Sequence, residues 1–279
     1  ATVDTIARVR VSDEQQVAPA VTGASGASAP GRDRYIDFLR AFSLLVVVAW
    51  HWVFTIVIWK DDGPHATSPI GFTTGLWAAT WLLQVMPLFF YVGGYSHLVA
   101  WRRAQAKGEH LGGFVLKRLR RLAVPALALL LTWVALGITL GAIFDLNWIG
   151  RAVLLVVSPL WFMAVYLGLI ALLPLFLWLH RRFDSIVLVF FAATAGAVDI
   201  LRFRYDLEWL GLVNMLAVWG LCHQLGFFYD RIVSATRRTD WTLLWAGLAG
   251  LAGLVFSGLY PGSMVGVPGE RSNMAPPTL

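Results

Sequence analysis

The chain has 279 residues, of which 58% are hydrophobic and only 14% are charged, and its mean hydropathy is +0.68. A soluble domain carries roughly 25% charged residues, so this composition argues against one and indicates an integral membrane protein. The net charge of +6 would suit nucleic acid in a soluble protein, but here it follows from topology, and no nucleic-acid partner is expected. The single cysteine, Cys222, excludes an intrachain disulfide.

The N-terminal segment differs in composition from the rest of the chain. It is rich in Ala, Gly, Ser, Thr and Val, shows no helical apolar periodicity, and lacks the apolar core of a signal peptide. We therefore predict a disordered cytoplasmic tail over residues 1–34 and a single membrane domain over residues 35–279.

Apolar runs long enough to cross a bilayer recur along the membrane domain and predict an all-α, polytopic transmembrane helix bundle. Of the 22 Lys and Arg residues, 17 lie in the tail and in alternate loops, against five on the opposite side. By the positive-inside rule we expect a multi-pass protein of the plasma membrane with a cytoplasmic N-terminus. The seven predicted spans are 41–59, 76–98, 122–144, 159–179, 185–201, 209–229 and 241–260.

Arg40 and His51 lie eleven positions apart at the start of the first span. On a helix that spacing is about three turns, so both side chains share one face, with a rise of roughly 16 Å between them. We place Arg40 at a membrane boundary and His51 near the middle, where an imidazole could act as base or transfer residue. Alternatively, Arg40 only anchors the helix end and His51 hydrogen-bonds a neighbouring helix. Asp37 can pair with Arg40.

Four cations stand within five residues directly before the third span, ahead of Pro125. Guanidinium groups bind phosphate through bidentate hydrogen bonds and stay charged, so the run could hold a phosphorylated cytoplasmic ligand. The alternative is a topogenic patch that attracts anionic lipid head groups. The four residues are Lys117, Arg118, Arg120 and Arg121.

The second span contains Pro87 and the pair Gly93–Gly94. We expect a kink at Pro87 and a close approach of a helix or ligand at the two glycines. The alternative is an ordinary kinked packing helix.

Other polar residues support weaker predictions. His223, Gln224 and Asn214 are expected to form interhelical hydrogen bonds. Asp199, Glu208 and Trp161 could meet an acceptor at the outer side, although the favoured interpretation of Asp199 and Glu208 is that they are solvated loop charges. His97 and His110 are expected at the cytoplasmic surface. No metal-ligand spacing is present, so no metal is expected.

Several of these motifs, in this order, resemble the acyltransferase-3 family of membrane O-acyltransferases. The resemblance rests on an Asp-x-Leu-Arg motif, an Arg-x10-His signature, a Pro-Leu-Phe-Phe run and an Arg-rich run before a proline. It is clearest over residues 35–125, and Gly93 stands where the family has Ser. The family has ten spans, so we expect this chain to lack the last ones. The matching positions are Asp37, Arg40, His51, Pro87 to Phe90, Gly94, Arg118, Arg120, Arg121 and Pro125.

The resemblance implies an acyltransferase that moves an acyl group, most simply acetyl, from cytoplasmic acyl-CoA to a hydroxyl of an extracytoplasmic or lipid-linked glycan. It implies His51 and Arg40 as catalytic residues and the basic run as the acyl-CoA site, with Asp37, Pro87 and Gly94 in support. Two alternatives stay open: a transporter or flippase for a glycan or lipid, and a non-catalytic membrane partner. The sequence leaves the acceptor, the acyl chain length, the role of His51 as base or acyl carrier, and the oligomeric state undecided.

Overall fold

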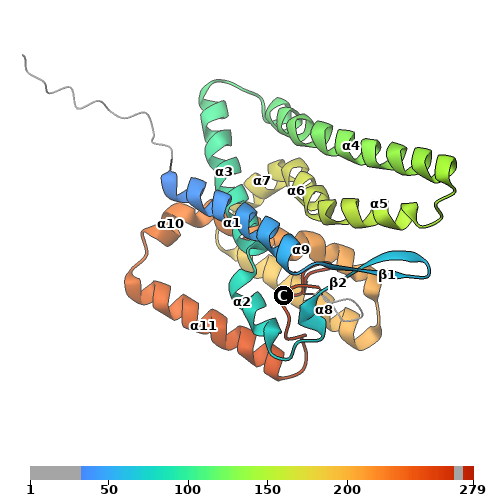
Figure 1. Cartoon of the computed structure of the whole chain (residues 1–279). Helices are drawn as coiled ribbons and strands as arrows, with labels where there is room; N and C mark the ends of the chain where they lie inside the picture. The colour runs from blue at the N-terminus through green and yellow to red at the C-terminus, as the bar shows by residue number, and fades with distance from the viewer. Residues whose placement is uncertain (1–32, 267–272) are drawn as a thin grey trace, which may run out of the picture. The chain divides into compact units, whose positions relative to one another are not determined.

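The computed structural model describes residues 33–266 and 273–279, and the chain divides into two units after Arg34. The predicted disordered tail lies almost wholly outside the described residues, so the description below concerns the second unit. That unit is predominantly helical with one β-hairpin (Figure 1). Its α-helices are α1 (Arg34–Val53), α2 (Ala79–Leu83), α3 (Met86–Ala106), α4 (Leu111–Phe144), α5 (Ile149–Val157), α6 (Trp161–Ala171), α7 (Leu173–Phe183), α8 (Ile186–Tyr205), α9 (Gly211–Leu225), α10 (Tyr229–Val233) and α11 (Arg237–Phe256).

Seven helical segments of the described chain are long and apolar enough to cross a membrane, which confirms the predicted all-α polytopic architecture. Most of their boundaries differ from the prediction because hydropathy locates a span but not the ends of its helix. The seven segments are Arg34–Val53, Leu76–Ala106, Leu111–Phe144, Ile149–Ala171, Ile186–Tyr205, Glu208–Val233 and Arg237–Phe256.

The first span is shorter at its C-terminal end than predicted. Helix α1 stops at Val53, and the next apolar residues form β1 (Ile56–Lys60), which pairs antiparallel with β2 (Gly63–Thr67). The sequence Ile-Val-Ile-Trp is β-branched and aromatic, which suits a strand, and Gly63 takes the positive φ of 112° that the turn requires. The prediction of helix up to residue 59 was therefore wrong.

The second span is broken before Pro87 rather than kinked at it. The short helices η2 (Leu76–Ala78) and α2 come first, and α2 ends at Leu83. Pro87 lies in the first turn of α3, where a backbone N–H would have no intrahelical acceptor, so the proline costs no hydrogen bond. Helix α3 then continues to Ala106, eight residues beyond the predicted end of the span.

Helix α4 begins before its predicted span, and α5 lies between two predicted spans, so both contain residues that were expected to be loops. Helix α4 is 34 residues long and begins at Leu111, so the basic run lies inside the helix rather than before it. Helix α5 occupies a stretch expected to be an outer loop and lies beside α4 (Figure 1), with Val153 filling the space left by Gly137.

The core forms where α9 packs against α3, α6 and α8. Phe90 of α3 stacks on Trp219 of α9 with ring centroids 4.8 Å apart, and both side chains are buried. Helix α11, by contrast, has no buried residue.

The short 3-10 helices connect these elements. They are η1 (Pro69–Gly71), η2, η3 (Ser158–Leu160), η4 (Glu208–Leu210) and η5 (Gly226–Phe228).

Candidate active site

Helix α1 carries both Arg40 and His51, so the predicted common face is present. The buried side of α1 contains Ile36 and Ser43, and Arg40 lies at the edge of that side. Its Nη2 atom donates to the Ser96 hydroxyl of α3 at 2.6 Å, and its Nη1 atom lies 3.6 Å from a carboxylate oxygen of Asp37. The contact with Ser96 holds Arg40 against α3, and the predicted pairing with Asp37 within α1 is present.

His51 lies in the last turn of α1, two residues before its end, and its side chain is exposed. The neighbouring Trp50 stacks on Phe54 with ring centroids 4.0 Å apart, which fixes the chain where it leaves the helix. An exposed imidazole at this point is free to meet a reactant.

Of the four basic residues of α4, only Arg118 faces the protein. Its guanidinium lies 4.6 Å from the centre of the Phe114 ring and is half-buried. Lys117, Arg120 and Arg121 are exposed. Helical periodicity explains the difference, because Phe114 and Arg118 are four residues apart and therefore share the inward face.

A buried cluster of His97, His223 and Tyr166 joins three helices. Nδ1 of His97 lies 3.0 Å from Nε2 of His223, and the Tyr166 hydroxyl lies 3.3 Å from Nε2 of His97. Arg40 and Arg118 interact electrostatically with both His97 and Tyr166. Two cations from separate helices thus act on one connected chain of proton-carrying groups and on each other, and a bound anion would relieve their mutual repulsion.

The sequence analysis missed this cluster because it placed His97 at the surface. His97 is only 1% exposed, since α3 continues for nine residues beyond it. The available signal was its position four residues after Gly93, on the face that also carries Phe90 and Trp101. His110, by comparison, is exposed as predicted, and the predicted interhelical bond of His223 is confirmed.

The two glycines of α3 allow the cluster to form. A Cβ on Gly94 would collide with the backbone carbonyl of His223, and a Cβ on Gly93 would lie 2.8 Å from the Tyr166 ring. Gly226 meets the backbone of α3 in the same way, at the Tyr91 carbonyl. The predicted close approach at Gly93–Gly94 is confirmed, and its partners are α9 and Tyr166.

The residues expected on the acceptor side lie in two places. Asp199 is 1% exposed, so its interpretation as a solvated loop charge was wrong. It accepts hydrogen bonds from Asn214 at 2.8 Å and from Tyr260 at 2.9 Å. Burial and the bond to Asp199 raise the pKa of Tyr260. This network ties α8 to α9 and confirms the predicted interhelical bonding of Asn214.

Arg202 connects Asp199 to Glu208. It lies 3.6 Å from Asp199 and donates to Glu208 at 3.3 Å, while Glu208 remains exposed. Trp161 is elsewhere, beside Trp219 with ring centroids 6.1 Å apart. The predicted acceptor residues therefore do not form one surface.

Within residues 33–266 and 273–279, no group of three or more His, Cys, Asp or Glu side chains is arranged to hold a metal ion.

Fold and site together define a multi-pass, all-α membrane protein with cationic and imidazole groups in its interior. The acyltransferase-3 family model, described as an acyltransferase domain, matches residues 33–278. The match extends far beyond residues 35–125, and it shows that the chain belongs to the acyltransferase-3 family. Comparison with curated proteins and with solved structures gave no significant match.

Proposed function

We propose that this membrane acyltransferase takes an acyl group, most simply acetyl, from cytoplasmic acyl-CoA and delivers it to a hydroxyl of an extracytoplasmic or lipid-linked glycan. The observation that carries the proposal is the convergence of Arg40 and Arg118 on the buried cluster of Tyr166 and His97. A polyanionic donor is the ligand class that these two cations attract. The 17 basic residues on the predicted inner side support a donor on the cytoplasmic side.

Arg118 is the residue of the basic run that we assign to donor phosphates inside the bundle. Lys117, Arg120 and Arg121 are exposed on the same helical turn and attract the donor from solution. Asp37 and Ser96 fix the orientation of the Arg40 guanidinium, which keeps its remaining N–H groups available to the ligand.

We assign group transfer to His51. Its imidazole takes the proton of the acceptor hydroxyl, the hydroxyl oxygen attacks the thioester carbonyl, and the C–S bond breaks to release CoA, whose thiolate is then protonated. In the variant of this route, an imidazole nitrogen attacks first and carries the acyl group to the hydroxyl. The helix rise of roughly 16 Å between Arg40 and His51 is spanned by the long arm that joins the phosphates of CoA to its thioester.

The experiment uses the purified full chain in nanodiscs with radiolabelled acetyl-CoA. Release of CoA and label retained on the protein are followed for wild type, His51→Ala and His110→Ala. We expect His51→Ala to abolish transfer, whereas the exposed His110 is the matched control and should leave it unchanged. Label on wild-type protein that is absent from His51→Ala would identify the acyl carrier. Full activity of His51→Ala would overturn the assignment, and the absence of acetyl-CoA binding by wild type would overturn the choice of donor.

A further inference from the structure

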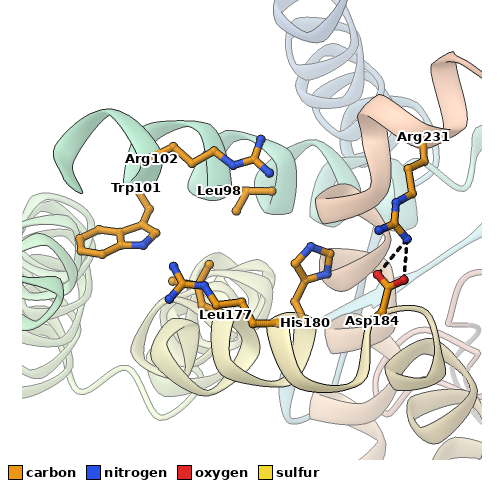
Figure 2. A pocket seen from close by; sticks show the side chains of 8 residues that line it. Leu98, Trp101, Arg102, Leu177, His180, Asp184 and Arg231 are labelled. Atoms are coloured by element: carbon orange, nitrogen blue, oxygen red, sulfur yellow. Dashed lines mark hydrogen bonds and ion pairs between the residues drawn. The ribbon is translucent and has the colours of Figure 1, made fainter. Parts of the chain in front are cut away.

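A cavity of about 390 Å³ opens between α3, α7 and α10 (Figure 2), and neither Arg40 nor Arg118 lines it. In Figure 2, Trp101 and Arg102 of α3 face Leu177 and His180 of α7 across this space. The lining residues are Leu98, Trp101, Arg102, Leu177, His180, Arg181, Asp184 and Arg231.

The charge of the lining is positive. The lining contains three guanidinium groups and a single carboxylate, that of Asp184. This carboxylate already pairs with Arg231 at a distance of 2.8 Å. Arg102 lies 3.6 Å from Asp230, whereas Arg181 forms no ion pair among the described residues. The cavity therefore keeps cationic charge that the described chain does not neutralise.

Two buried nitrogen atoms of the lining have no hydrogen-bond partner among the described residues. They are Nε1 of Trp101, whose side chain is 94% buried, and Nδ1 of His180. An indole N–H can only donate, and a buried donor without an acceptor is destabilising. In Figure 2 the indole nitrogen of Trp101 turns toward the space between α3 and α7. A ligand rich in acceptor oxygens would satisfy it.

From the uncompensated charge and the unpaired donors, we infer that this cavity binds the phosphate group of an anionic ligand. Phosphate oxygens match the fork of a guanidinium and accept from an indole or imidazole N–H. The apolar side chains Leu98 and Leu177 give the organic part of the ligand a surface to contact. Two sources share this chemistry, namely the head group of an anionic phospholipid and a soluble organic phosphate.

The site is independent of the acyl-transfer assignment because it shares no residue with it. Its test therefore measures binding rather than activity. The full chain in neutral detergent micelles is unfolded thermally, in one arm with pyrophosphate at constant ionic strength. In the other arm the micelles contain phosphatidylglycerol or, as the comparison, phosphatidylcholine. A ligand that binds the folded state raises Tm in a saturable way.

Arg181→Gln and Trp101→Phe remove one cation and one donor, and each should raise the half-saturating concentration about tenfold or more. Arg182→Gln is the matched control, because Arg182 is the next residue of α7 and does not line the cavity, and it should change that concentration less than about twofold. Arg181 is exposed, so Arg181→Gln tests the site even if Trp101→Phe fails to fold.

Saturation by pyrophosphate would identify a soluble phosphate as the source, and saturation by phosphatidylglycerol alone would identify a lipid head group. The inference would be overturned if neither ligand stabilised the wild type, if phosphatidylcholine acted as strongly as phosphatidylglycerol, or if Arg182→Gln lost as much affinity as Arg181→Gln.

Discussion

His97 and His223 are 126 residues apart in the chain, yet Nδ1 of one lies 3.0 Å from Nε2 of the other. One nitrogen must donate and the other accept, so the tautomer of each ring is set by its partner. The Tyr166 hydroxyl at Nε2 of His97 extends the chain to a third helix. This buried contact stabilises the packing of α3 on α9, and Arg40 and Arg118 interact electrostatically with its His97.

The His97–His223 contact predicts strong coupling between the two positions. His97→Leu or His223→Leu alone leaves a buried imidazole nitrogen unpaired, so each should lower the free energy of unfolding by about 1–3 kcal/mol. The double variant removes both partners and should lose less than the sum, by about 0.5–3 kcal/mol. Unfolding of the four proteins in micelles measures this cycle, and strictly additive losses would contradict it.

Gly94→Ala should destabilise the bundle. Its Cβ would collide with the His223 carbonyl, and overpacking of this kind costs about 1–3 kcal/mol. Gly250→Ala in α11 is the control, because nothing lies within 4 Å of a Cβ there. Thermal unfolding in detergent compares the two, and an equal Tm for both variants would show that α3 and α9 are not in contact at Gly94.

Arg118→Gln should raise KM for acetyl-CoA by about tenfold to a hundredfold, since a charge-assisted hydrogen bond contributes about 1.5–3 kcal/mol. Arg120→Gln, in the same helix but exposed, should have a distinctly smaller effect because surface charges contribute about 0–1 kcal/mol. Initial rates against acetyl-CoA concentration distinguish them. If both variants gave the same KM, the inward position of Arg118 would have no role in donor binding.

Arg40→Lys keeps the charge but cannot reproduce the fork that contacts Ser96 and Asp37. We expect kcat/KM to fall about tenfold or more with little change in Tm, because the side chain is 45% exposed. Arg237→Lys, at the exposed start of α11, should leave both quantities unchanged. Wild-type kinetics for Arg40→Lys would mean that positive charge alone suffices there.

His180 predicts a pH dependence of stability. Burial lowers its pKa below the ordinary 6.5; Asp184 opposes the shift, while Arg231, Arg102 and Arg181 add to it. The unfolded chain therefore binds the proton more readily, and the free energy of unfolding should fall as pH drops from 6.5 through the folded-state pKa. His180→Phe should reduce this loss while retaining the ring contacts with Phe227 and Phe228. Unfolding measured at several pH values checks it, and identical slopes for variant and wild type would contradict it.

The sequence by itself determined the features that depend on local order. Mean hydropathy identifies seven spans because a helix in lipid satisfies its own backbone and needs only an apolar surface. Helical periodicity places Arg40 and His51 on one helix, and paired glycines allow close contact wherever they occur. The order of motifs is sufficient to recognise the acyltransferase-3 family before any coordinate is known.

Only the tertiary structure decided which polar groups meet. Helical periodicity shows which residues share a face with Arg118 or His97, but it does not show that His223 is the partner of His97, because that depends on which face a distant helix covers. The sequence predicts Asp199 as a solvated loop charge, whereas in the structure α9 packs against it and buries it. The phosphate cavity is assembled from three helices distant in the chain. Burial and pairing are properties of packed surfaces, and a linear pattern does not specify the partner.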